Sequence, residues 1–391
     1  MSIYIVTFSV SLFFSFLSEN EKNKSIQNVC LFIAVLIPCI LAGMRDVTIG
    51  VDTSGYVKTL YDVAAKSSSI KQYYLSSFYY EWNFKPIITF DFAYTLLTYI
   101  CATLFRSFGA FLFCTEAVIM IPIVAALKQI NKYFNINITV SLLLFYLIYY
   151  NTTFNAVRQW LSIGFAFLAI AHLCTDKKSK RIVIYIVLSI LFHKSGMLVL
   201  VLMVLYYVIN EAKRKMLRVG NITYDYDKMK VLFVAFICIL LLMSMTYIIV
   251  PVMSRIGLSR YVGYINGHIS FSINQVIYQV PYLLILAISG HTLSKDESDD
   301  KLLKNFKLFS LCVFIVNAVF SQLATVMENS WRMVILFGLF NVLTFSFIYQ
   351  NENNRSKKLL LLFILLIYGC FYWYFVYVLT GRHGTVPYIS A

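Results

Sequence analysis

The sequence predicts an all-α, polytopic membrane protein, and three observations support this class. Of the 391 residues, 60% are hydrophobic and 13% are charged, which is about half the charged fraction of a soluble domain. Mean hydropathy is +0.75. The apolar residues also come in blocks that approach or reach the ~20 helical residues needed to cross a hydrocarbon core. Together these features exclude a soluble domain.

The apolar blocks give the expected helices in chain order. They cover residues 3–17, 28–44, 92–105, 110–127, 138–151, 154–174, 181–193, 195–210, 231–250, 277–293, 308–327, 331–348 and 359–379. The first block has no basic segment before it and no small-residue cleavage site after it. We therefore expect it to be the first membrane helix rather than a signal peptide.

The basic loops between the blocks predict the topology. Lysine and arginine gather at residues 22–24, 177–181, 213–230, 295–307 and 355–358, and segment 128–137 joins this set. The positive-inside rule places these loops in the cytoplasm. The segments expected to face outward are loop 45–91, the turns near 152–157 and 193–195, loop 251–276, the turn at 328–330 and the tail from residue 380.

Block 92–105 does not fit this alternation. Loop 45–91 is expected outside and segment 128–137 inside, so an odd number of crossings must separate them, but two blocks, 92–105 and 110–127, lie between them. With about 14 residues at 1.5 Å each, block 92–105 is too short for a ~30 Å core. We interpret it as an interfacial or re-entrant helix on the outer side. The prediction is one integral membrane domain over residues 1–391, with 12 spanning helices, a structured first outer loop at 45–91 and a second at 251–276.

Two composition features have simple explanations. The net charge of +15 does not indicate nucleic-acid binding, because most lysines lie in the short loops that orient a membrane protein. The eight cysteines form no Cys-x-x-Cys pair and have no histidine at ligand spacing, so we expect small buried hydrophobic residues rather than a metal site. No cofactor is predicted.

Loop 43–56, which reads GMRDVTIGVDTSGY, carries the strongest polar signal. Its glycines indicate tight turns at a membrane boundary, and Arg45 stands beside two carboxylates, Asp46 and Asp52. The simplest alternative is that the arginine and the aspartates only pair with each other.

Further polar groups stand at other outer helix ends. Arg158 begins block 154–174 within NAVRQW, where an ionisable group is costly unless it faces a cavity or a partner. Snorkelling of Arg158, a plain polar turn at His193 and a salt bridge at Arg332 are the structural alternatives. A shared anionic pocket, suited to phosphate or pyrophosphate, would combine Arg45, Arg158, Gln159, His193, Lys194, Arg260, Tyr261 and Arg332.

At these residues the sequence resembles the EpsG family, which includes Wzy-type polymerases of bacterial surface polysaccharides. The resemblance rests on GMRDVTIGVDTSGY at 43–56, VRQWLSIGFAFLAIA at 157–171 and LFHKSGMLVL at 191–200. Two departures are Val51, where Gly-Thr-Asp is the commoner pattern, and Phe90-Asp91-Phe92, where Glu with Pro or Gly is commoner. The second departure leaves the role of Asp91 open.

The resemblance implies a fold and a reaction. The fold would be similar to glycosyltransferase C, in the bacterial inner membrane, with the active site toward the periplasm. The enzyme would transfer a growing glycan from undecaprenyl pyrophosphate to a lipid-linked acceptor repeat unit, with Asp52 or Asp46 as the base. Partners would be these two substrates, membrane lipids and a chain-length regulator, but no nucleic acid.

Two other activities stay open at this point. A lipid-linked oligosaccharide flippase would also have about a dozen helices and basic residues in its cavity. An O-antigen ligase would use a similar lipid-linked donor. A transporter is expected to show internal repeats, and the sequence contains none that we can recognise.

Overall fold

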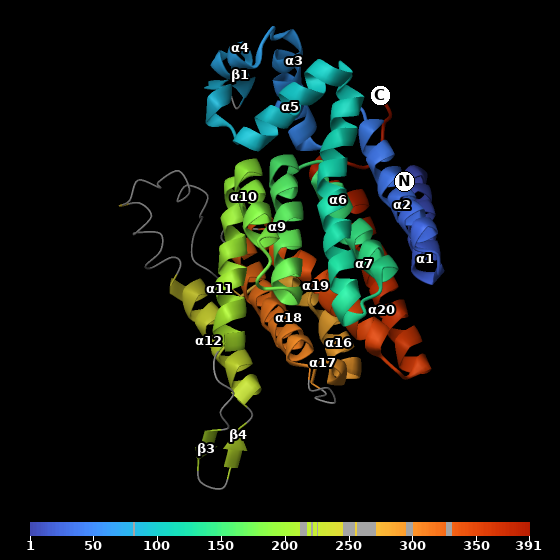
Figure 1. Ribbon diagram of the computed structural model, residues 1–391, viewed down its shortest axis with the longest axis vertical. Helices are drawn as coiled ribbons and strands as arrows, with labels where there is room; N and C mark the ends of the chain where they lie inside the picture. Colours follow the sequence, from blue (N-terminus) through green and yellow to red (C-terminus); the bar gives the residue numbers. More distant parts are fainter. Residues whose placement is uncertain are drawn as a thin grey trace. The chain divides into compact units, whose positions relative to one another are not determined.

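The computed structural model describes residues 1–80, 83–211, 217–219, 222–224, 226–244, 255, 271–294, 300–325 and 331–391. The chain forms two compact units, which are described separately (Figure 1). Unit 1 consists of Met1–Val199 and Leu362–Ala391, and unit 2 of Leu200–Leu361. Across the described ranges the strands form two hairpins only, and almost everything else is helical. The all-α class is therefore confirmed.

Within the described residues, seven helices are long and apolar enough to cross a membrane. They are α1 (Ser2–Asn20), α2 (Lys24–Gly43), α6 (Phe108–Phe134), α9 (Val157–Thr175), α18 (Lys301–Phe320), α19 (Trp331–Asn351) and α20 (Arg355–Trp373). Shorter apolar helices occupy the remaining predicted blocks. A multi-pass membrane protein is thus confirmed, whereas the count of 12 crossings stays a prediction.

Helices α1, α2, α6 and α9 make the main helix packing of unit 1, with α7 (Ile138–Phe145) and α10 (Arg181–Phe192) beside them. Short polar side chains begin several of these helices. Asn23 accepts a hydrogen bond from the backbone N–H of Ser25, and Ser107 does the same for Ala110. Such caps satisfy backbone donors that an apolar helix leaves unpaired at its first turn.

Residues 45–91 of unit 1 form folded structure rather than an open loop. The chain passes through a π-helical turn, η1 (Thr53–Val57), then α3 (Lys58–Lys66), α4 (Ile70–Leu75) and the strands β1 (Ser77–Tyr80) and β2 (Asn83–Pro86). The strands pair antiparallel, and the 3₁₀ turn η2 (Ile87–Thr89) follows. The glycines of the motif predicted a loop, but residues 51–57 are helical. Gly50 makes a turn with a positive φ, whereas Gly55 does not have a positive φ and lies within the helical turn.

Helix α5 (Phe92–Phe105) has the same bounds as the predicted interfacial block. Its first residue follows Asp91, which pairs with Arg158 at the start of α9. Its last residue is followed by a turn at Arg106 and Ser107 that leads into α6. The start of α6 lies against the end of α2, where a Cβ on Gly109 would come within 2.7 Å of Gly43 O.

Both ends of α5 therefore meet the same end of the helix bundle, formed by the end of α2 and the starts of α6 and α9. In Figure 1, α5 runs obliquely beyond the ends of α9 and α10 rather than alongside them. This arrangement agrees with an interfacial helix. Its position relative to a membrane stays a prediction.

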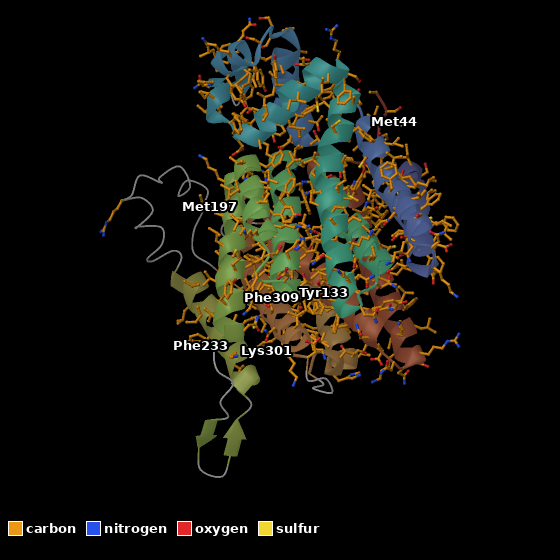
Figure 2. The ribbon with its side chains drawn as sticks, in the orientation of Figure 1. Met44, Tyr133, Met197, Phe233, Lys301 and Phe309 are labelled. Atoms are coloured by element: carbon orange, nitrogen blue, oxygen red, sulfur yellow. The ribbon has the colours of Figure 1, made fainter. Side chains whose placement is uncertain are left out.

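The other connections at this end are a turn and the C-terminal tail. The turn η4 (Lys194–Met197) joins α10 to α11 (Leu198–Glu211). Figure 2 labels Met44, next to the end of α2, and Met197, in η4, toward the same end of the unit 1 helices. After α20 the chain continues through η7 (Tyr374–Leu379) and η8 (Arg382–Gly384). It ends in an extended tail hydrogen-bonded to the segment after α2.

Unit 2 is built around α18, which packs on α12 (Tyr226–Ser244) and α19. It also contains most of α11, β3 (Leu217–Val219), β4 (Ile222–Tyr224), α15 (Ile273–Ile277), α16 (Val280–Ser289), α17 (His291–Ser294), η6 (Ser321–Thr325) and the start of α20. Aromatic contacts fill its core, for example Tyr282 stacked on Phe345. The predicted second outer loop, 251–276, lies mostly outside the described residues.

Candidate functional site

The segment after α2 is held in place by the C-terminal tail. The backbone N–H of Asp46 donates to Ile389 O at 2.9 Å, that of Ala391 to Met44 O at 2.9 Å, and that of Gly50 to Gly384 O at 3.0 Å. Gly50 has φ +88°, and a Cβ there would come within 2.4 Å of Phe154 O. Glycine is therefore required at this turn, which leads directly into Asp52.

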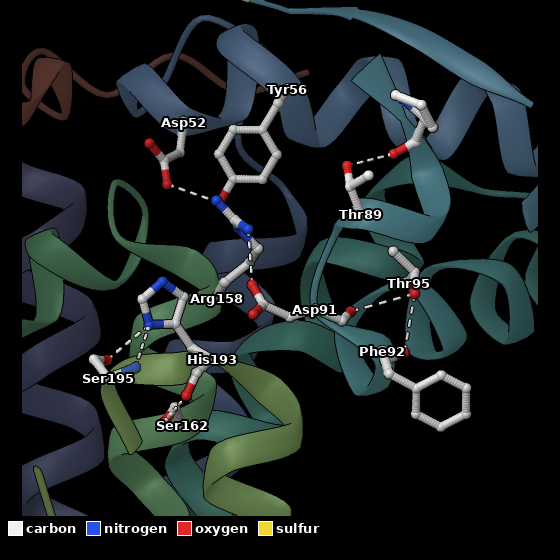
Figure 3. A network of polar contacts seen from close by, with 11 residues as sticks. Asp52, Tyr56, Thr89, Asp91, Phe92, Thr95, Arg158, Ser162, His193 and Ser195 are labelled. Atoms are coloured by element: carbon white, nitrogen blue, oxygen red, sulfur yellow. Dashed lines mark hydrogen bonds and ion pairs between the residues drawn. The ribbon is translucent and has the colours of Figure 1, made fainter. Parts of the chain in front are cut away.

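Asp52 begins a chain of hydrogen bonds that ends on Arg158 (Figure 3). The Tyr56 hydroxyl donates to Asp52 Oδ2 at 2.9 Å and accepts from Arg158 Nε at 3.3 Å. Asp52 and Tyr56 are four residues apart on one helical turn, which brings their side chains together. Burial, and next the charge of Asp52, hold the pKa of Tyr56 well above its usual range, so the phenol stays a neutral donor to the carboxylate.

Arg158 is the centre of the cluster. Its Nη1 lies 2.7 Å from Asp91 Oδ2, and the two side chains are 23% and 9% exposed. The guanidinium carbon lies 4.9 Å from the Tyr56 ring centre and 4.5 Å from that of Phe90. Each such cation–π contact contributes about 0.5–2 kcal/mol. The arginine is thus held by a carboxylate and two rings, and it does not snorkel away from the protein.

His193 faces this cluster from the turn after α10. The backbone N–H of Ser195 donates to His193 Nδ1 at 3.1 Å, and Ser195 Oγ lies 2.7 Å from the same nitrogen. Because Nδ1 accepts a backbone hydrogen bond, the neutral ring carries its proton on Nε2. Figure 3 shows the other edge of the ring turned away from Ser195, toward the side on which Asp52 and Arg158 lie. His193 therefore presents an N–H donor there.

The turn that carries His193 is fixed on α9. Ser162 Oγ and Ser189 Oγ are 3.0 Å apart, and Ser189 Oγ donates to Ser162 O at 2.9 Å. Ser162 Oγ also lies 3.4 Å from His193 O. Polar side chains that hydrogen-bond between adjacent helices in an apolar bundle hold them in register. The polar turn predicted from the sequence is thus anchored one helical turn beyond Arg158.

Asn155 connects this cluster to the tail. Its Oδ1 accepts from the backbone N–H of Asp52 at 3.2 Å, and its Nδ2 lies 2.6 Å from His383 Nδ1. His383 is buried, 9% exposed, and has a positive φ of 74°. A residue near the C-terminus is therefore in contact with the residue that holds Asp52.

Arg45 is placed differently from Arg158. It is 2% exposed, its Nη1 donates to Ala42 O at 2.9 Å, and its guanidinium lies 4.2 Å from the Phe154 ring centre. Burial lowers the pKa of Arg45, and the nearby carboxylate of Glu116 opposes this. Glu116 is itself 2% exposed and accepts from Thr153 Oγ1 at 2.9 Å. These contacts hold Arg45 inside the protein.

The other predicted site residues have different surroundings. Asp46 accepts from the Thr48 hydroxyl at 2.7 Å and from its N–H at 2.9 Å, and these bonds lower the pKa of Asp46. Gln159 is buried next to Arg158, and Lys194 is exposed. Arg332 belongs to unit 2, 5.4 Å from the Trp331 ring centre. Arg260 and Tyr261 lie outside the described residues.

Several residues that contact the predicted site residues were not themselves predicted as site residues. Tyr56 could have been found from its spacing of four to Asp52, and Asp91 from its place directly before an apolar helix. Glu116 is the one charged residue within block 110–127, and ionisable residues in such blocks are usually functional or paired. His383 gave no local signal, because its contact to Asn155 spans 228 positions.

The aromatic residues of the first outer loop are divided between core and surface. Tyr73 is fully buried and stacks on Tyr99, whereas Tyr79 is 50% and Phe84 71% exposed. Trp82 lies outside the described residues. Tyr79 and Phe84 are therefore available to a sugar or a lipid, whereas Tyr73 is part of the core.

The cluster offers acid–base and anion-binding groups together. Asp52 is a carboxylate that receives one hydrogen bond from Tyr56, and Arg158 and His193 supply N–H donors. In the described part of the chain, no three His, Cys, Asp or Glu side chains are grouped as metal ligands. Six of the eight cysteines are buried, as predicted, while Cys114 is half-buried and Cys370 is exposed.

Comparison with known proteins gives one result. No protein of curated function and no solved structure matches this chain. The sequence profile of the EpsG family matches residues 28–390, which includes the cluster and the tail that supports it. The chain therefore belongs to the EpsG family, which is associated with polysaccharide polymerase-like membrane proteins.

Proposed function

We propose that this protein polymerises undecaprenyl-pyrophosphate-linked oligosaccharide repeat units into a surface polysaccharide, at the periplasmic face of the inner membrane. Membership of the EpsG family gives the class of pathway. The observation that supports the reaction is the row of Asp52, Tyr56, Arg158 and Asp91 at one end of an apolar helix bundle. This row combines a proton acceptor with an anion-binding group.

The reaction transfers a glycan from a polyprenyl pyrophosphate to a hydroxyl of the acceptor repeat unit. Asp52 takes the proton of that hydroxyl, and the new glycosidic bond forms as the bond to the pyrophosphate breaks. Arg158 and the Nε2–H of His193 stabilise the charge on the departing pyrophosphate. Asp91 and the two aromatic rings keep the guanidinium oriented before the substrate arrives.

Between the two aspartates of loop 43–56, Asp52 suits the role of base and Asp46 does not. Asp46 is engaged by Thr48 and sits where the tail pairs with the chain. The Asp52 carboxylate lies next to Tyr56 and in the same hydrogen-bonded row as Arg158. Asp46 therefore makes a matched control for the test below.

The experiment is deletion of the gene, followed by gel analysis of the surface polysaccharide. The expected result is loss of the polymer ladder while a single repeat unit is still attached. Loss of every unit would contradict a polymerase and favour a flippase or a ligase. In the complemented strain, Asp52→Ala and Arg158→Ala should abolish the ladder when strains with equal amounts of the protein in the membrane are compared. Asp46→Ala should keep it, and normal ladders from both site variants would overturn the assignment.

The expected size follows from general acid–base catalysis, where loss of the base lowers the rate about 10²–10⁴-fold. Loss of one preorganised charge stabiliser costs about 10²–10³-fold. Either loss removes long chains from a gel, because chain length depends on many successive transfers.

A further inference from the structure

The C-terminal tail places a histidine against the residue that holds Asp52. His383 lies in η8, and Thr385 just after it accepts hydrogen bonds from Tyr4 through its carbonyl and from Asn151 through its hydroxyl. Gly384 O accepts from Gly50 N–H at 3.0 Å. The tail is thus attached to α1, to the helix before Asn155 and to the turn before Asp52. His383 is fixed in position by these bonds on its neighbours.

The orientation of the Asn155 amide is determined by its two contacts. The backbone N–H of Asp52 can only donate, so the Asn155 atom 3.2 Å away is the oxygen. The amide nitrogen then faces His383 Nδ1 at 2.6 Å and must donate to it. His383 Nδ1 is therefore an acceptor, and the ring is neutral with its proton on Nε2.

We propose that His383 is a positioning residue for Asp52, which acts through Asn155. Neutral His383 keeps the amide of Asn155 turned so that its oxygen holds the backbone N–H of Asp52. Protonation of His383 puts a hydrogen on Nδ1, which then faces the NH₂ group of Asn155. Two donors oppose each other, so the Asn155 amide must turn or move away. The N–H of Asp52 then loses its acceptor, and the carboxylate is no longer held beside Tyr56. This assignment rests on the proposed role of Asp52.

The charged and titratable groups on the elements around His383 are Tyr4 on α1, Tyr377 in η7, Asp52 just before η1, Arg158 on α9, His193 before η4 and Arg382 beside His383 itself. Among these side-chain types, only histidine ordinarily titrates between pH 5 and 8. A variant in which residue 383 cannot be protonated therefore separates the pH response due to His383 from that due to His193.

The chain allows such a variant, His383→Asn. Asparagine tolerates a positive φ better than most residues, which suits the value of 74° at this position. Its Oδ1 occupies about the position of histidine Nδ1 and accepts a hydrogen bond, but it does not titrate. His383→Ala removes the acceptor.

The test is hydrogen exchange of the purified full-length protein, resolved to the Asp52 amide and corrected for the intrinsic exchange rate. At pH 7.5 we expect His383→Ala to exchange this amide about tenfold faster than the wild type, and His383→Asn within about twofold of it. Between pH 7.5 and 5.5 the wild type should lose about tenfold protection, whereas His383→Asn should not. If His383→Ala does not fold, the pH comparison of the other two proteins decides.

Equal protection in all three proteins, or the same pH response in the wild type and His383→Asn, would overturn the proposal. A second measurement is polymer length in cells grown at external pH 5.5 and 7.5, which should shorten at pH 5.5 with the wild type and less with His383→Asn. If hydrogen exchange behaves as expected while deletion of the gene leaves the polymer unchanged, the proposed function is wrong, and the positioning of Asp52 by His383 is still supported.

Discussion

At the scale of single residues, Arg45 and Arg158 differ in their surroundings. Arg158 contacts Asp91 and two aromatic rings and remains 23% exposed. Arg45 is 2% exposed and lies near the buried carboxylate of Glu116. Among the described residues, Arg45 Nε and Glu116 Oε1 have no hydrogen-bond partner. The sequence predicted both arginines as substrate-binding. This role stays a prediction, and we propose it for Arg158 alone.

Arg45→Met and Arg158→Met should therefore fail in different ways. Arg45→Met removes a buried cation together with its hydrogen bond to Ala42 O and its contact with the Phe154 ring, which costs about 1–3 kcal/mol. We therefore expect a lower thermal unfolding temperature and less protein in the membrane, with a ladder from the protein that remains. Arg158→Met leaves Asp91 without its ion-pair partner, so it should also lose some stability, but the protein that remains in the membrane should give no polymer ladder. The measurements are thermal unfolding in detergent and the polysaccharide gel. Full stability of Arg45→Met would contradict the structural role of Arg45.

At the scale of elements, the predicted loop 43–56 forms a tight turn followed by helix. Gly50 makes the turn with φ +88° and close contact to Phe154 O, whereas the nearest atom to a Cβ at Gly55 is 3.9 Å away. The glycines in this motif are thus not equivalent. The sequence indicated a tight boundary segment, but the contact with Phe154, and hence the reason for Gly50, depends on tertiary packing.

Gly50→Ala and Gly55→Ala form a matched pair. We expect Gly50→Ala to destabilise unit 1 by about 1–3 kcal/mol, because alanine is strained at positive φ and here also meets a carbonyl oxygen. Gly55→Ala should change stability by less than about 0.5 kcal/mol. Thermal unfolding of the two purified variants checks this. Equal unfolding temperatures would show that the turn adapts to a side chain.

At the scale of the whole molecule, the basic loops and apolar blocks predict which segments share a side of the membrane. In unit 1, the segment after α2, the residues before α9, the His193 turn and the tail do meet at one end of the helices. The positive-inside rule had grouped these segments together. Their contacts agree with that grouping, and both ends of α5 lie there as well.

Single cysteines introduced into a variant without native cysteines test this topology. We expect Ile88→Cys and Arg106→Cys, before and after α5, to react with a membrane-impermeant maleimide added from outside, because α5 does not cross. Lys22→Cys, between α1 and α2, should be protected in intact cells and react after permeabilisation. If α5 crosses the membrane, the cysteines at residues 88 and 106 will react from opposite sides.

The sequence by itself determined the membrane class, the approximate position of the apolar helices in the described ranges, the basic loops and the motif around Asp52. Each of these depends on local composition or on periodicity along one segment. Only the tertiary structure decided which charges share a site. Asp91 and Arg158 are 67 positions apart, and Asn155 and His383 are 228 apart. Such contacts follow from how the helices pack, and one sequence carries no local record of that packing.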